Sequence, residues 1–230
     1  MTVSSVVPRV AGHDSSLGRF QRVGLVAVVV LGPLSVTVLR AVLPYHAADD
    51  SATIATTVAD HSTVQSLVLW LTLTAALTLV PAVITVGLLA ARHSRGLATW
   101  GMALAVAGFS LLFATTVVDF TALAGAESGI GRDATTRLLD ALTTSLTQTV
   151  AVTGFVVGHI LGLVLLGAAL LRGRVIPAWA AWALILSQPL HVVFAVIVPA
   201  NTLDAAAWAL TTIAFATAAT AIGRPVRSSR

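Results

Sequence analysis

The chain has 230 residues, of which 57% are hydrophobic and only 10% charged, and its mean hydropathy is +0.95. This composition lies far outside that of soluble globular domains, so a lipid bilayer must supply much of the solvent. All thirteen basic residues are arginine, and the net charge is only +4. The absence of cysteine excludes disulfides, thiolate nucleophiles, iron–sulfur clusters and thiolate zinc sites.

Six apolar runs are long enough to cross a membrane, because about 20 apolar residues span a hydrocarbon core of roughly 30 Å. We therefore predict an all-α, polytopic membrane protein with six transmembrane helices in one bundle. The predicted spans are approximately 21–43, 65–91, 97–124, 146–171, 177–199 and 204–222. They make up a six-span domain over 19–223, flanked by a mobile cytoplasmic tail over 1–18 and a basic cytoplasmic tail over 224–230.

Arginine is concentrated in alternate gaps between these runs. Ten of the thirteen arginines lie on the face that holds both termini, and three lie on or near the other face, namely Arg40, Arg132 and Arg137. The positive-inside rule then places both termini in the cytoplasm. We expect a bacterial cytoplasmic membrane, because the exclusive use of arginine as basic residue resembles coding in a GC-rich bacterial genome. This distribution also explains the basic charge better than binding to nucleic acid does.

The first apolar run is a membrane span and not a signal peptide in this interpretation, because it is too long for a signal-peptide core and ends in no small-residue cleavage pattern.

The gaps between the runs hold no soluble domain. The two longer outer gaps, 44–64 and 125–145, are too short to fold alone, so we expect them to cap the bundle. Leucines at 138, 139 and 142 suit one face of an interfacial helix. Trp70 and Trp208 lie near outer span ends, where interfacial rings are preferred.

Four ionisable residues stand out inside the predicted spans, namely Arg40, Asp119, His159 and His191. A charged side chain near the centre of a span costs on the order of 2.5 to 3.5 kcal/mol, so each must be paired, hydrated or close to an end. Arg40 and Asp119 both come near outer span ends. We predict an ion pair between them, which serves either as a structural clasp or as part of a ligand or ion site.

The two histidines are expected to face the same layer of the bundle. The midpoint between His159 and His191 is residue 175, inside the short turn that joins the fourth and fifth spans. In an antiparallel pair of helices this puts them at matching depth, roughly 20 Å from the inner boundary. His191 shares a helix face with Ser187 and Gln188, and Pro189 removes one backbone hydrogen bond in the same turn.

A ridge of small residues accompanies this polar layer. Gly154, Gly158 and Gly162 are spaced by four, which places them on one helix face and permits close approach of another helix or a ligand. Three interpretations of the layer remain open. The polar groups can be packing contacts between helices, they can line a pocket for a small molecule, lipid group or proton, or the two histidines can ligate haem b. A chain that moves electrons across a membrane usually needs two haems, and only one histidine pair is present here. We therefore predict no cofactor and keep haem b as an alternative.

The first outer gap is also rich in possible metal ligands. His46, Asp49, Asp50 and His61 lie within 16 residues, and imidazole and carboxylate groups coordinate divalent metals. Their spacing matches no defined site. We predict no metal site and keep this group as the alternative.

The fourth and fifth spans carry a recognisable pattern over residues 154–192. Its elements are Gly158-His159-Ile160-Leu161-Gly162, then Arg174, Pro177, Trp179, Ala180, Trp182 and Ala183, then Ser187-Gln188-Pro189-Leu190-His191. The pattern resembles uncharacterised six-span integral membrane proteins common in actinobacteria, which are grouped in families of unknown function. The resemblance implies a compact six-helix protein without an assigned activity, and it adds no catalytic residue.

Together these features predict an integral membrane protein of unassigned, non-catalytic function, whose polar layer in the outer half of the bundle binds a small ligand or a partner. We predict no catalytic residue, although the sequence does not exclude an enzyme. Besides the haem protein, the alternative is a small secondary transporter, although 21–124 and 146–222 show no convincing repeat. The expected partners are the lipid bilayer and a membrane protein or a second copy of the chain, with no nucleic acid.

Overall fold

The structure is a computed structural model that describes residues 18–222, and these residues are entirely helical apart from short connections. The tails predicted over 1–18 and 224–230 lie outside the described residues, except for Gly18. The elements in chain order are α1 (Arg19–Val42), α2 (Ser51–Asp60), α3 (Ser62–Ala91), α4 (Arg95–Ser110), α5 (Leu112–Ser128), α6 (Arg132–Thr143), α7 (Leu146–Arg172), α8 (Ala178–Val192), the π-helical turn η1 (Val193–Ile197) and α9 (Asn201–Ala219).

Six segments of the described chain are long and apolar enough to cross a membrane, which confirms the all-α, six-span class. They are α1, α3, α4 with α5, α7, α8 with η1, and α9, and their ends differ from the predicted ends by a few residues. The third span differs in kind. It was predicted as one helix, but it is interrupted at Leu111, where the backbone leaves helical geometry between α4 and α5.

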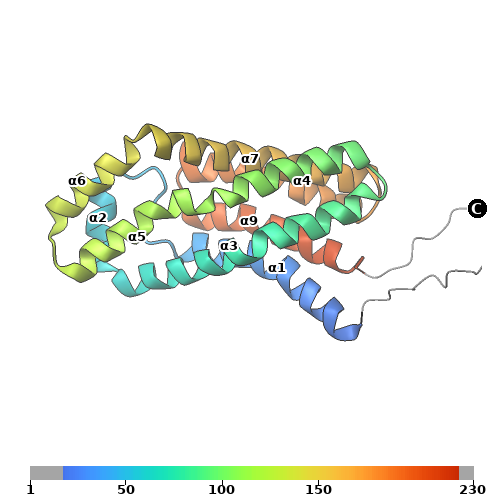
Figure 1. The fold of residues 1–230 in the computed structure, drawn as a ribbon, viewed down its shortest axis with the longest axis horizontal. Coiled ribbons are helices and arrows are strands. Elements are labelled where there is room, and N and C mark those ends of the chain that lie inside the picture. The colour runs from blue at the N-terminus through green and yellow to red at the C-terminus, as the bar shows by residue number, and fades with distance from the viewer. Residues whose placement is uncertain (1–17, 223–230) are drawn as a thin grey trace, which may run out of the picture.

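The six long segments run side by side, and the two ends of the bundle differ (Figure 1). The start of α1 and the end of α9 lie at one end, which we call the terminal end. The short helices α2 and α6 lie at the opposite end, which we call the capped end, beside α5 (Figure 1). The two outer gaps therefore fold as helices that cover one end of the bundle, where Ile54, Val58, Leu123 and Leu139 form a separate apolar core.

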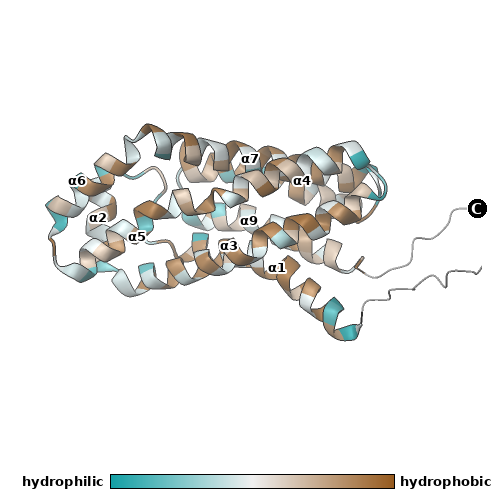
Figure 2. Cartoon of the chain, in the orientation of Figure 1, coloured by the Kyte–Doolittle hydropathy of each residue, from teal (hydrophilic) through white to brown (hydrophobic). Residues whose placement is uncertain are grey.

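Large apolar side chains remain exposed along the long helices. Leu77, Leu88 and Ile197 are 69%, 57% and 68% exposed. Figure 2 shows hydrophobic colour along the long helices and hydrophilic colour mostly near their ends. Apolar surface of this extent is expected where lipid tails, rather than water, surround the protein.

The interface between α4 and α7 is built from small residues. A methyl group added at Gly158 would lie 2.8 Å from the Cα of Gly108, and one added at Gly162 would lie 2.4 Å from the backbone nitrogen of Ala105. Gly154 faces the side chain of Leu111 at 2.9 Å in the same construction. The glycine ridge predicted on α7 therefore lies against α4 at backbone contact distance, which fixes His159, the neighbour of Gly158, deep in the bundle.

Candidate polar ligand site

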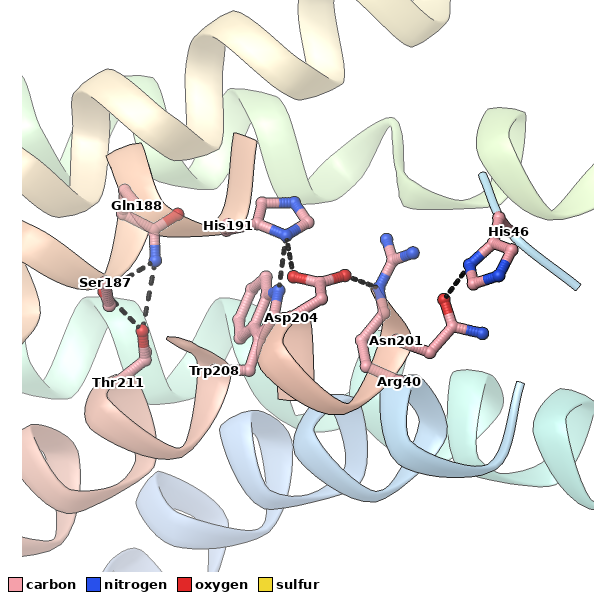
Figure 3. Close-up of polar contacts among 9 residues, drawn as sticks. All are labelled: Arg40, His46, Ser187, Gln188, His191, Asn201, Asp204, Trp208 and Thr211. Carbon is pink, nitrogen blue, oxygen red and sulfur yellow. Dashed lines mark hydrogen bonds and ion pairs between the residues drawn. The ribbon is translucent and has the colours of Figure 1, made fainter. Parts of the chain in front are cut away.

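The centre of the site is an ion-pair network around Asp204 (Figure 3). Asp204 is 1% exposed, and its Oδ1 lies 2.5 Å from Nδ1 of His191. Its Oδ2 lies 3.4 Å from Nε of Arg40. Three helices, α1, α8 and α9, therefore each contribute one ionisable group to a buried cluster.

This arrangement corrects the predicted partner of Arg40. The sequence interpretation paired Arg40 with Asp119, but the structure pairs it with Asp204. The error came from treating residues 200–204 as a short outer turn. Helix α9 in fact begins at Asn201, so Asp204 occupies its first turn and points into the bundle. A carboxylate in the first turn is favoured by the helix dipole, which supports this placement locally.

Trp208 belongs to the same cluster and is not an interfacial ring as predicted. Its side chain is 2% exposed, and its indole nitrogen lies 3.2 Å from Nδ1 of His191. That imidazole nitrogen carries either a proton or a lone pair, so it cannot donate to Asp204 and accept from Trp208 at once. The shorter, charge-assisted contact with Asp204 is the stronger of the two, so we assign the proton to Nδ1 of His191.

His159 lies beside His191, as expected from their matching distance to the turn between α7 and α8. Their ring centroids are 5.8 Å apart. His159 is fully buried, stacks on Phe155 at 4.4 Å and lies 6.1 Å from the ring of Trp208. Its Nδ1 lies 2.7 Å from the carbonyl oxygen of Phe155, while its Nε2 has no hydrogen-bond partner.

Next to the histidines, Ser187 and Gln188 form a second polar group with Thr211 of α9 (Figure 3). Thr211 donates to Oγ of Ser187 at 2.8 Å, and Ser187 donates to the carbonyl oxygen of Leu184. The amide nitrogen of Gln188 donates to both hydroxyl oxygens at 3.1 Å. All three side chains are fully buried, so this group joins α8 to α9 in the interior.

Asp119 has a separate set of partners toward the capped end. Its Oδ1 accepts a hydrogen bond from the Tyr45 hydroxyl at 2.5 Å and another from the Gln65 amide at 2.6 Å. Burial and the neighbouring Asp119 carboxylate raise the pKa of Tyr45 well above its usual value, so the phenol remains a donor. Two donors on one oxygen match an ionised carboxylate, which only accepts.

The loop after α1 connects these clusters. The amide nitrogen of Asn201 donates to the carbonyl oxygens of Leu43 and Tyr45, both at 2.9 Å, and its amide oxygen lies 3.1 Å from Nδ1 of His46. We call Leu43–His46 the strap, because it crosses from α1 to the start of α9 and also reaches Asp119 through Tyr45. It follows Arg40 by about one turn, at the end of α1 that points toward the capped end (Figure 1).

The alternative metal group in this region is not assembled. Within the described residues no three histidine or carboxylate side chains lie close enough to hold a metal ion. Asp49 accepts from the backbone of His46, Asp50 caps α2 by accepting from the backbone of Thr53, and His61 lies against the carbonyl of Thr57. These residues therefore have local structural roles instead of a shared site.

The backbone near the site is irregular. Pro189 lies inside α8 and donates no backbone hydrogen bond, and α8 changes into the π-helical turn η1 directly after Val192. A π-helical turn widens the helix and frees backbone groups, and such turns are frequent at functional sites. His191 is thus presented at the end of the last regular turn before the wider segment.

Several residues of the site were missed from the sequence, namely Tyr45, Gln65, Asn201, Asp204, Trp208 and Thr211. A signal for three of them was present. Asp204, Trp208 and Thr211 are spaced by four and three, which places them on one face of a helix. The helix start at Asn201 had to be recognised before this spacing became visible. Nothing in the sequence connects Tyr45 or Gln65 to Asp119.

The fold and the cluster define a multi-pass all-α membrane protein with a buried network of charged and polar side chains. The chain belongs to the family described as Domain of unknown function (DUF4386), whose model matches residues 23–223. The match covers residues of all six spans of the chain and confirms membership of a family of unknown function; the actinobacterial and six-span character of that family stay predictions. No curated protein and no solved structure matches the chain.

Proposed function

We propose that this protein is a non-catalytic, ligand-binding protein of the bacterial cytoplasmic membrane, and that the network of Arg40, Asp204 and His191 binds a small polar ligand. Both termini lie in the cytoplasm in this proposal, so the capped end faces outward. The arginine distribution supports this orientation, because six arginines of the described chain lie at or near the terminal end of its helices, namely Arg19, Arg22, Arg92, Arg95, Arg172 and Arg174.

One observation carries the proposal, which is the burial of an incompletely bonded ion-pair network inside a membrane protein. Ionisable side chains are expensive at this depth, and a purely structural contact between helices needs only hydroxyl or amide groups. Here three charged or ionisable groups from three helices meet, and Nε of Arg40 and Nε2 of His159 still lack hydrogen-bond partners. Groups left without partners can bind a ligand.

In this proposal the ligand reaches the network from the capped end. The Arg40 side chain is 20% exposed, whereas Asp204 behind it is 1% exposed. The strap lies at this end and is held there by the hydrogen bonds from Asn201 to the carbonyl oxygens of Leu43 and Tyr45. Opening the strap would expose Arg40 without disturbing the α4–α7 interface.

The test is ligand-dependent thermal stability of the purified protein in detergent, measured with a panel of small anions, amines, amino acids and sugars. A ligand that binds the folded state raises Tm by mass action. The expected result is a Tm rise that disappears in Arg40→Gln and Asp204→Asn and persists in Asp60→Asn, which alters an exposed ion pair at the capped end. A rise that is the same in all variants would contradict the location of the site.

A small secondary transporter is the second candidate function, and the interrupted helix at η1 favours it. Transporters commonly bind substrates where a membrane helix is discontinuous. The π-helical turn begins two residues after His191. Reconstitution in proteoliposomes with any ligand found by the stability panel distinguishes the two, because a transporter moves that ligand into the vesicle and a binding protein does not.

A further inference from the structure

Among the buried polar atoms without a hydrogen-bond partner, acceptors outnumber donors. Four buried side-chain atoms of the described residues lack a hydrogen-bond partner, namely Arg40 Nε, Gln65 Oε1, His159 Nε2 and Gln188 Oε1. Only Arg40 Nε is a donor, and it already lies in an ion pair. The other three accept hydrogen bonds, and buried acceptors without donors cost free energy.

The orientation of each acceptor follows from its partners. Nδ1 of His159 faces a backbone carbonyl, which only accepts, so Nδ1 carries the proton and Nε2 has a free lone pair. The hydroxyl of Ser187 donates to Leu184 and the hydroxyl of Thr211 donates to Ser187. Gln188 must therefore present its amide nitrogen to both, which leaves its oxygen free.

The buried charges are also unequal, because two carboxylates face one guanidinium. Asp204 contacts Arg40 and His191 through its two oxygens, and Asp119 accepts from two donors, so both carboxylates fit the ionised state. Arg40 supplies one positive charge. With both histidines neutral, Arg40 and the two carboxylates together carry a net charge of −1, which a single added positive charge would neutralise.

From the unpartnered acceptors and the net negative charge, we propose that this site also takes up one proton, at Nε2 of His191, beside the small ligand of the proposed function. This inference goes beyond the proposed function and is tested independently of it. A hydronium ion at the capped end gives a proton to the lone pair of Nε2, which forms an N–H bond and leaves water behind. The product is an imidazolium held by Asp204 through Nδ1.

The surroundings of His191 fit this assignment. The charged or titratable groups around it are Asp204 of α9 and His159 of α7, the two helices packed against α8, and Arg40 of α1, which pairs with the same Asp204 carboxylate. The ring of His159 stacks on Phe155 at a centroid distance of 4.4 Å and lies 6.1 Å from the ring of Trp208, and the centroids of the two imidazoles are 5.8 Å apart and tilted by 54°. Rings packed this closely suit a proton, which needs no additional volume.

The experiment is a pH titration of the full-length protein in nanodiscs with ¹⁵N-labelled histidine, observing the imidazole nitrogens by NMR. Comparison with His159→Phe and His191→Asn assigns the signals. The expected result in the unmodified protein is that Nε2 of His191 changes from an unprotonated to a protonated nitrogen in one reversible step while near-UV circular dichroism stays constant. An unprotonated Nε2 down to pH 4.5 with an intact fold would falsify the proposal.

Charge variants give a pattern of signs that a packing role would not produce. Arg40→Gln removes a nearby positive charge and should move the midpoint of the His191 titration to higher pH. Asp204→Asn and Asp119→Asn each remove a negative charge and should move it to lower pH. His159→Phe keeps the stacked ring, removes the acceptor and should also move it to lower pH. Asp60→Asn is the control and should leave the midpoint unchanged; shifts of uniform sign would overturn the assignment.

A final arm separates the proton from a small ammonium ion, which has the same charge and donates hydrogen bonds. Ammonium chloride is added at fixed pH, with sodium chloride at equal ionic strength as the control. No change in the His159 and His191 signals is expected. A change specific to ammonium, without titration of His191, would overturn the proton assignment and leave the small-ligand proposal standing. The small-ligand proposal is tested separately, by the Tm measurements with the panel of small ligands.

Discussion

Two helix interfaces in this bundle are built in opposite ways. Helices α4 and α7 meet through glycine and alanine at backbone contact distance, and no side-chain hydrogen bond joins them in the described chain. Helices α1, α8 and α9 meet through Arg40, His191 and Asp204. Lipid tails provide no hydrophobic force between helices, so close packing can hold one interface without polar groups. Charged side chains are therefore not required to hold helices together here, which is why we assign a function to the interface that contains them.

The largest effect should come from filling the α4–α7 interface. Gly162→Val places a side chain where even a methyl group would lie 2.4 Å from the backbone nitrogen of Ala105, so the helices must separate. We expect a loss of about 3 kcal/mol or more in the free energy of unfolding, at or beyond the upper end for overpacking. Size-exclusion chromatography and Tm in detergent measure it.

Gly24→Ala is the matched control for this variant, because a methyl group there meets no atom within 4 Å. The control should fold as the unmodified protein does. If Gly162→Val also kept its Tm, close packing would not be what holds α4 against α7.

The second effect tests the charged interface. Asp204→Ala leaves Arg40 and His191 without their shared partner, and removal of one member of a buried ion pair costs about 3–5 kcal/mol. Since the Arg40 side chain is 20% exposed, we expect the lower end of that range. A double-mutant cycle of Arg40→Ala with Asp204→Ala in chemical unfolding measures the coupling directly.

A second double-mutant cycle, with Asp119 in place of Asp204, decides between the observed and the predicted partner of Arg40. Arg40→Ala and Asp119→Ala should be close to additive, because the structure contains no direct ion pair between them. A larger coupling with Asp119 than with Asp204 would restore the sequence-based pairing.

A smaller effect is expected from the uncharged polar group between α8 and α9. Thr211→Val removes the hydroxyl that donates to Ser187 and accepts from Gln188, so we expect a loss of about 1–2 kcal/mol in stability. Thr217→Val is the control, because the Thr217 hydroxyl lies on the exposed side of the same helix and bonds only to the carbonyl of Ile213. Equal losses of Tm in the two variants would mean that the buried group adds nothing specific.

The smallest effect concerns the cap at the start of α2, far from both interfaces. The hydrogen bond from the Thr53 backbone lowers the pKa of Asp50. A carboxyl group with a lowered folded-state pKa stabilises the folded state above its unfolded pKa, and this contribution is lost as the pH falls through the folded value. Asp50→Ala should lower Tm slightly at pH 7 and progressively less toward pH 3. A constant difference across this range would show that the carboxylate charge is not involved.

The sequence determined the class of this protein, because six apolar runs can satisfy their backbone hydrogen bonds in a bilayer only as helices. It also placed His159 and His191 in one layer, since helix rise and a short turn fix their relative depth. The glycine ridge was visible because residues spaced by four share a helix face.

Only the tertiary structure decided which polar groups meet. Asp204 lies beyond the last outer turn in the sequence, and its inward position depends on α9 starting at Asn201. Arg40 could reach more than one carboxylate, and the choice of Asp204 over Asp119 depends on how α1 lies beside α9. Depth along the membrane follows from counting residues in each span. Rotation and neighbour choice follow from packing between helices that are distant in sequence, which no single span encodes.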